Sequence, residues 1–465
     1  MIRNKGAPDG GGVPRSAIMG QAPIWGLMLR FSGPSIVSMM VASSYNIVDA
    51  IYVGRLGSEA LAALTIAFPL MMISLAVGRG TGIGAASIIS RCLGSGDHDG
   101  ANKTAGVTIS LTILTGALMA IIVLPNMVAV LRLFGATESV LPPAKSYMSI
   151  LAAFAVVEFF PLIISDIIRA EGNPMFASVA LIISAVINII LDPIFIWGLG
   201  PIPAMGIAGA AIATVIGRSI GGIVLLVYLV SGKTSYRFRP SYFLPSPKIV
   251  AEIYRVGLAS IVHMTAGSVI MVLANRITIA FGIVPLAIRG VLFRTGSFAF
   301  MPCMGLGQGV LPLVGYNFGA KQKDRVGEVV IKASLVSLVW GVLCWVAVML
   351  FSTEIMSIFN TDPQFLLEGV PALRIFALAF CAIGIQMILS SFFQGIGKGI
   401  PSMVLASARQ ILFLLPALLI LPRIFGLTGV WASFPVADSL AVILTLVWTG
   451  IEFHRQGIRF RLRYN

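Results

Sequence analysis

The segment PSIVSMMVASSYNIVDAIYVGRLG, residues 34–57, decides how this chain is read. It is apolar enough for a membrane-spanning helix, yet Asp49 lies well inside it. A carboxylate at that depth costs about 2–3 kcal/mol or more, and such residues usually face a cavity where they have a function. A second apolar segment, NIILDPIFIWG, contains Asp192 in the same way. Two intramembrane aspartates therefore guide the functional prediction.

The composition indicates a polytopic membrane protein. The chain has 465 residues, of which 57% are hydrophobic and 11% charged, whereas soluble domains have about 25% charged residues. Because one span needs about 20 apolar residues, the apolar windows predict an all-α protein with twelve spans and short loops. The predicted spans are 27–50, 60–86, 105–131, 147–169, 176–198, 206–230, 254–275, 285–312, 331–352, 370–393, 401–422 and 427–450.

The net charge of +14 is explained by membrane topology and not by nucleic acid binding. Lys and Arg accumulate in cytoplasmic loops of membrane proteins. Most of the 32 basic residues fall at the two ends of the chain and in the loops after even-numbered spans. The opposite side holds Arg55, Arg132, Lys145, Arg276, Arg374 and Arg423. We therefore expect a multi-pass protein of the plasma membrane, surrounded by lipids, with both termini in the cytoplasm.

The halves of the chain repeat each other. A shift of 225 residues aligns 57–99 with 282–324 without gaps, and a shift of 220 pairs 205–213 with 425–433. Six spans per half give both halves the same orientation, as in transporters with a cavity between two bundles. The predicted organisation is a flexible cytoplasmic tail (1–24), a six-helix lobe (25–230), a cytoplasmic connector (231–248), a second six-helix lobe (249–452) and a basic cytoplasmic tail (453–465).

Each aspartate has a polar neighbour one helical turn away. Tyr45 precedes Asp49 by four residues, and Asn188 precedes Asp192 by four, so each pair shares a helix face. Pro193 lacks an N–H and leaves a carbonyl without its helical partner. A desolvated carboxylate with amide and carbonyl oxygens nearby suits an exchanging proton or a hard cation such as sodium. The structural alternative is that each aspartate pairs with a buried arginine or caps a broken helix.

At these motifs the chain resembles the MATE family (multidrug and toxic compound extrusion), in particular its archaeal and DinF-like branch. The resemblance is carried by YNIVDAIYVGRLG, GSEALAALTIAFP, RAEGNP at 169–174, NIILDPIFIWGLG and MGIAGAAIAT. It implies two six-helix lobes, alternating access, and export driven by inward proton or sodium flow, with no cofactor besides that ion. It points to Asp49 and Asp192 as the residues that hold the proton or sodium, with Tyr45, Asn188 and Tyr147 as polar neighbours.

Several residues in the first lobe have two interpretations. Pro34 is either a tolerated kink or a hinge that bends the first span when Asp49 changes charge. Asp166 lies three residues from Arg169 near the cytoplasmic end, which favours an interfacial ion pair. Glu158 lies deeper and has no partner nearby in the sequence. It is therefore a candidate cavity residue.

The second lobe has arginines in its apolar runs but no acid in its seventh span, which offers His263 instead. In this the chain departs from the NorM-like branch of the family, so ion coupling is expected in the first lobe alone. Arg294 resembles a family position and is a second candidate cavity residue, and Arg409 could pair with Asp438. These arginines either form structural ion pairs or meet anionic or zwitterionic substrates.

The predicted function is secondary antiport. The chain would act as a monomer and export small amphipathic, cationic organic compounds in exchange for protons or sodium. The alternative is a flippase for lipids or lipid-linked precursors, favoured by Arg289, Arg294 and Arg409. An enzyme is not expected, because the three histidines belong to no HExxH motif and no GxSxG or phosphate-binding motif is present. A passive channel stays open as a further alternative.

Overall fold

The computed structural model describes residues 15–458, which contain helices and no β-strand. The first half consists of η1 (Arg15–Ala17), α1 (Ile18–Gln21), α2 (Ile24–Gly54), α3 (Ser58–Ser95), α4 (His98–Val123), α5 (Met127–Leu133), α6 (Leu141–Ala153), α7 (Ala155–Ala170), α8 (Pro174–Trp197) and α9 (Ile207–Val230). The second half consists of η2 (Pro240–Phe243), α10 (Pro247–Ile279), α11 (Ile283–Gly319), α12 (Lys323–Ser357), α13 (Pro363–Ala377), α14 (Phe380–Gly395), α15 (Gly399–Ser407), the π-helical η3 (Ala408–Leu414) and α16 (Leu415–Gln456).

These helices make the twelve predicted spans. In the described residues, ten helical stretches are long and apolar enough to cross a membrane, or eleven when α6 and α7, bent by 55°, form one span. The last stretch, Gly399–Gln456, has 58 residues, far more than the about 20 that one crossing needs. It turns back at Gly426, where φ is 59° and ψ is −139°. The stretch is therefore two spans, and the all-α two-lobe prediction is confirmed.

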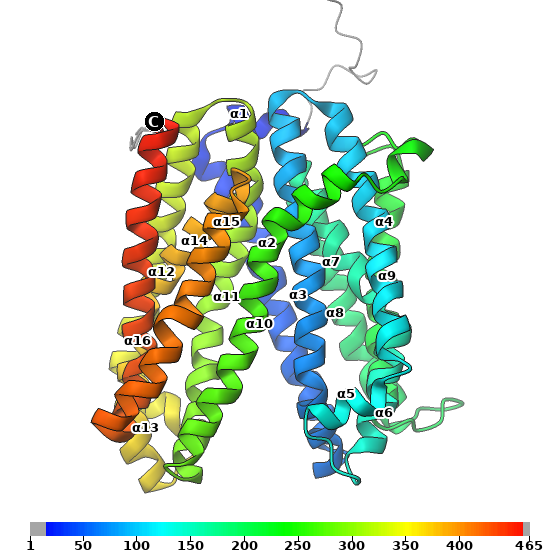
Figure 1. The fold of residues 1–465 in the computed structure, drawn as a ribbon. Coiled ribbons are helices and arrows are strands. Elements are labelled where there is room, and N and C mark those ends of the chain that lie inside the picture. The colour runs from blue at the N-terminus through cyan, green and yellow to red at the C-terminus, as the bar shows by residue number, and fades with distance from the viewer. Residues whose placement is uncertain (1–14, 459–465) are drawn as a thin grey trace, which may run out of the picture.

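The two lobes meet at one end of the molecule and diverge toward the other. In Figure 1 the helices converge at the end that carries α1 and the end of α16, and they spread apart toward α5 and α13. Small residues allow the close approach. A Cβ at Gly84 would lie 2.1 Å from the carbonyl oxygen of Ile253, and one at Gly94 would lie 2.0 Å from that of Tyr316. The closed end therefore depends on backbone contact between lobes, as small residues permit in membranes.

The backbone confirms the internal repeat. Gly57 and Gly282 precede α3 and α11 with φ/ψ of 119°/172° and 124°/175°. Gly206 and Gly426 have 55°/−135° and 59°/−139°. The first pair lies at the 225-residue shift and the second at the 220-residue shift. The two lobes thus repeat the same turns, including conformations that L-residues rarely adopt.

Replacing Gly206 by alanine is expected to destabilise the protein by about 1–3 kcal/mol, because a Cβ is strained in this backbone conformation. Thermal unfolding in detergent measures the effect. Gly26 in α2 is the control, because a Cβ there meets nothing within 4 Å and alanine favours a helix. Equal unfolding temperatures for the two variants would contradict the assigned strain.

The predicted N-terminal tail needs a correction. Residues 15–21 are helical, and Met19 is fully buried. The side chains of Asn317 and Arg325 donate hydrogen bonds to its carbonyl at 3.1 and 3.2 Å. This segment is packed against the second lobe because the polar groups of α11 and α12 bind its backbone. Residues 1–14 lie outside the described part.

The predicted C-terminal tail is shorter than expected as well. Helix α16 continues to Gln456, and Phe453 is buried against the aromatic rings of the second lobe. Residues 453–456 are therefore part of the last span because an apolar side chain anchors them. Residues 459–465 lie outside the described part of the chain.

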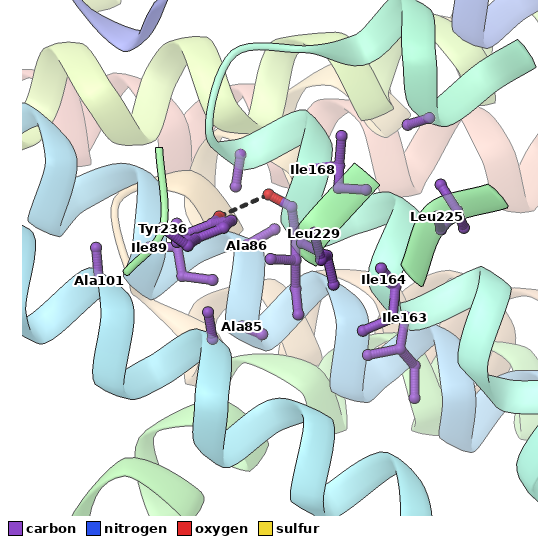
Figure 2. Close-up of a cluster of buried hydrophobic side chains, with 14 of the residues drawn as sticks. Ala85, Ala86, Ile89, Ala101, Ile163, Ile164, Ile168, Leu225, Leu229 and Tyr236 are labelled. Atoms are coloured by element: carbon purple, nitrogen blue, oxygen red, sulfur yellow. Dashed lines mark hydrogen bonds between the residues drawn. The ribbon is translucent and has the colours of Figure 1, made fainter. Parts of the chain in front are cut away.

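The connector at 231–248 is anchored to the first lobe. Figure 2 shows Tyr236 among Ile89 of α3, Ile168 of α7 and Leu229 of α9. Its hydroxyl donates a hydrogen bond to the carbonyl of Ile167 at 2.8 Å, the dashed line in Figure 2. An aromatic ring with its hydroxyl paired can be buried at low cost. The connector thus covers the core of the first lobe at the end where α9 ends.

Candidate functional site

A cavity of about 440 Å³ lies between the lobes. Its wall contains residues from α2, α3, α7 and α9 of the first lobe and from α10, α11 and α14 of the second. The methionines in the wall are Met39, Met71, Met72, Met119, Met148, Met264, Met301, Met304 and Met387. Methionine adapts its shape and is common on surfaces that accept many partners. The wall is therefore suited to apolar groups of varied shape.

Asp192 lies beside this cavity and is fully buried on α8. The Asn188 amide donates to the Asp192 carboxylate at 3.2 Å and to the Thr214 hydroxyl of α9 at 3.3 Å. Gly217 allows α9 to approach, since a Cβ there would lie 2.7 Å from the carbonyl oxygen of Ser184. The predicted pairing of Asn188 with Asp192 is thus present and is held by α9.

Asp49 joins this group from α2, which packs against α8. It lies near enough to Asp192 and Tyr147 for its charge to act on both. Among residues 15–458, no lysine or arginine forms an ion pair with either aspartate. The alternative that each aspartate merely pairs with a buried arginine is therefore wrong.

Three buried oxygens of this group have no hydrogen-bond partner among the described residues. They are Oδ1 of Asp49, Oδ2 of Asp192 and Oδ1 of Asn188. Buried polar groups are nearly always paired in folded proteins, and unpaired ones need an explanation. All three accept hydrogen bonds or cations and donate none. The group can therefore take up a proton or a cation.

Tyr45 makes a hydrogen bond that the sequence did not predict. Tyr45 lines the cavity, and its hydroxyl accepts a hydrogen bond from Arg218 of α9 at 3.3 Å and not from a partner at Asp49. Arg218 also lies 3.3 Å from the Glu158 carboxylate and donates to the Glu158 carbonyl at 3.4 Å. Glu158 faces the cavity as predicted. Arg218 was missed because no sequence-local signal links it to a partner on another helix.

Tyr147 and Pro34 both lie within helices, in α6 and α2. Tyr147 is buried on α6, outside the cavity wall, and the charges of Asp49 and Glu158 both reach it. Pro34 lies inside α2, which is one continuous helix. Its role as a hinge stays a prediction.

The arginines of the second lobe separate into three environments. Arg409 lines the cavity and forms the predicted ion pair with Asp438. Arg289 is buried and donates to the carbonyl of Met271 at 3.3 Å. Arg294 is exposed and does not belong to the cavity wall. It is therefore not part of the cavity wall, contrary to the prediction, because its side chain lies on the exposed surface of α11.

The MatE family model matches the chain twice, over residues 34–194 and 258–419. The multidrug export protein MepA of Staphylococcus haemolyticus is 27% identical over 432 residues, covering 92% of this chain and 93% of its own length. A crystal structure of MATE in the straight conformation superimposes with a TM-score of 0.91 at 26% identity, covering 96% and 100% of the two chains.

A Pyrococcus furiosus transporter of the MOP superfamily also has a similar structure. It has a TM-score of 0.90 and 26% identity, and the match covers 96% of this chain and 99% of that one. The double match of the family model agrees with the two-lobe repeat seen in the backbone. The chain therefore belongs to the MatE family: it is a multi-pass membrane transporter of the MATE type and not an enzyme.

Proposed function

We propose that this transporter exports amphipathic organic compounds, cationic ones included, in exchange for protons or sodium. Its relative in Staphylococcus haemolyticus is named a multidrug export protein. The methionine-rich wall of the cavity suits substrates of varied apolar shape. The proposed transporter works as a monomer in the plasma membrane, with its termini in the cytoplasm. In that orientation, the lobes diverge toward the outside.

The observation that carries the proposal is the group of unpaired oxygens on Asp49, Asp192 and Asn188. Two nearby carboxylates with no arginine or lysine partner cannot both stay ionised at low cost. A bound proton neutralises one carboxylate, and a bound sodium ion likewise compensates one of the two negative charges while both carboxylates can contact it. In the proposal, either ion is held by Asp49 and Asp192, and the oxygen chemistry suits both ions equally.

The ion site and the cavity share helices. Asn188 lines the cavity and binds Asp192, while Tyr45 lies one turn from Asp49 and contacts Arg218 in the cavity wall. A change of charge at Asp49 alters how α2 packs against α8. In the proposed cycle, α2 then bends at Pro34. The hydrogen bond between Tyr45 of α2 and Arg218 breaks, and the substrate is released.

The proposal is tested with purified protein in proteoliposomes and ethidium as the amphipathic cation. A pH gradient and a sodium gradient are imposed in separate experiments. One of them should drive ethidium accumulation against its concentration gradient, and the collapse of that gradient by an ionophore should stop it. Accumulation in neither condition, with equilibration still occurring, would indicate a passive channel instead.

A lipid flippase is the second candidate, and specific residues of the cavity favour it. Arg79, Arg218 and Arg409 line the wall, whereas Arg289 and Arg294 do not. Guanidinium groups suit phosphate-bearing headgroups. The decisive measurement is the movement of fluorescent phosphatidylglycerol between leaflets, detected by dithionite quenching. If the rate of lipid flipping stayed the same in the presence of excess ethidium, the flippase would be favoured.

A further inference from the structure

The closed end of the cavity contains an arginine without a full counter-charge. Arg79 of α3 lines the cavity, and its side chain is 11% exposed. Its contacts are the sulfur of Met39 at 3.8 Å and the carboxylate of Asp166 at 3.7 Å. A thioether is a weak acceptor, and 3.7 Å is longer than a direct hydrogen bond. The guanidinium of Arg79 is therefore weakly satisfied.

Asp166 is already committed to another arginine. Its carboxylate accepts from Arg169 at 2.6 Å, and the two side chains are only 7% and 2% exposed. Gly82 makes this position possible, since a Cβ there would lie 2.4 Å from Oδ2 of Asp166. Two guanidinium groups thus share one carboxylate. The group of Arg79, Asp166 and Arg169 has a net charge of +1.

The second lobe adds a polar group at the same place. The amide nitrogen of Gln308 on α11 donates to the sulfur of Met39 at 3.5 Å, the same sulfur that Arg79 contacts. Two donors, one of them charged, therefore share one weak acceptor. A carboxylate or phosphate oxygen would accept from both far more strongly. The Gln308 carbonyl oxygen is also buried without a partner among the described residues.

The internal repeat shows that the fold does not require this charge. At the 225-residue shift, the counterparts of Arg79, Asp166 and Arg169 are Met304, Ser391 and Gln394. The local packing is equivalent, because a Cβ at Gly307 would lie 2.8 Å from the Ser391 hydroxyl, just as one at Gly82 would meet Asp166. The second lobe builds the same helix contact from uncharged residues.

The other charges in the described wall are compensated. Glu158 lies 3.3 Å from Arg218, and Arg409 is paired with Asp438. The uncompensated charge at the cavity is therefore the positive charge at Arg79. Because this charge is positive and lies in the cavity wall, it can bind an anionic group of a substrate.

We propose that Arg79 and Gln308 form a subsite for an anionic oxygen group, a carboxylate or a phosphate, on an amphipathic substrate. The apolar part of the substrate lies against the methionines of the wall. This inference rests on the proposed function and deepens it, since it names a chemical group that the exporter recognises. Because Arg79 and Gln308 belong to opposite lobes, the bound group connects the lobes at their closed end.

The test compares two fluorescent amphiphiles that differ only in charge, 11-(dansylamino)undecanoic acid and its primary amide. Both are titrated into the purified full-length protein in a non-ionic detergent. The wild-type protein should bind the acid about tenfold more tightly than the amide, as expected for a charge-assisted hydrogen bond. Arg79→Met should remove this preference by weakening acid binding about tenfold, with amide binding within about twofold of wild type.

Two further variants keep the test decisive. Arg294→Met removes an exposed arginine outside the cavity wall and should keep the preference for the acid. Gln308→Leu should weaken acid binding independently, even if Arg79→Met folds poorly. Equal binding of acid and amide by the wild-type protein, or an unchanged preference in both Arg79→Met and Gln308→Leu, would overturn the subsite.

Competitors identify the source of the anionic group. Dodecyl phosphate represents a free amphiphile, and phosphatidylglycerol in mixed micelles represents a lipid headgroup. Displacement of the acid by either one supports the subsite and names its occupant, whereas displacement by neither overturns it. Because no ion gradient is imposed, binding can fail while gradient-driven transport succeeds, or the reverse, so the two proposals are separable.

Discussion

Asp49→Asn is expected to abolish uphill export while the protein stays folded. Asparagine keeps the size of the side chain, but it neither exchanges a proton in the accessible pH range nor supplies the negative charge that holds sodium. The variant therefore binds no proton or sodium between α2 and α8, and an ion gradient cannot drive export. The initial rate of gradient-driven ethidium accumulation in proteoliposomes should fall to that of protein-free liposomes.

The control for this variant is Asp324→Asn, which changes an exposed carboxylate in the first turn of α12. It should export at the wild-type rate. The free energy of unfolding of Asp49→Asn should lie between the wild-type value and about 1 kcal/mol above it. The reason is that a buried carboxylate without a partner is unfavourable. Full uphill export by the asparagine variant would contradict coupling through Asp49.

Asp166→Ala is expected to cause the largest loss of stability, about 3–5 kcal/mol. It leaves the guanidinium groups of Arg79 and Arg169 close together without the carboxylate that they share. The Arg169 side chain is only 2% exposed, so water cannot replace the lost partner. Titration of mixed micelles with sodium dodecyl sulfate measures the unfolding free energy.

The repeat supplies the matched control for this loss. Ser391 occupies the corresponding position in the second lobe, and its hydroxyl donates to the carbonyl of Met387 one turn earlier in the same helix. Ser391→Ala should therefore cost less than about 1 kcal/mol. If the two alanine variants lost equal stability, the charged group would not be what holds α3 and α7 together.

Much of the fold could be predicted from the sequence because the bilayer constrains it. Apolar windows predicted all twelve spans. The shift of 225 residues paired Gly57 with Gly282, and the two glycines have the same backbone conformation in the structure. The windows missed the short helix at 18–21, since its burial depends on Arg325 and other polar groups of distant helices. A hydropathy pattern contains no information on such contacts.

The candidate site was predicted in part. Spacing along one helix found Asn188 with Asp192, because residues four apart share a face. It also found the ion pair of Asp166 and Arg169, whose side chains are buried inside the protein. Arg218 and its contacts to Tyr45 and Glu158 connect three helices, and pairings of that kind arise only when the lobe is assembled.

The first lobe has the proposed ion-binding residues and residues of the cavity wall on the same helices. Asp49 lies on α2 one turn after Tyr45, whose hydroxyl accepts from Arg218 in the cavity wall. The second lobe has Ala274 at the position of Asp49 under the 225-residue shift, and that alanine is fully buried. The scaffold is duplicated, but the aspartate proposed for ion coupling is not, as expected if coupling occurs in the first lobe alone.

The most direct test of coupling is ion movement driven by substrate alone. Proteoliposomes are preloaded with ethidium, no ion gradient is imposed, and internal pH and radioactive sodium uptake are recorded as ethidium leaves. Antiport predicts that protons or sodium enter in proportion to the ethidium lost, and that Asp49→Asn shows no such entry. Ethidium loss through the wild-type protein at the same rate with neither ion moving would contradict antiport.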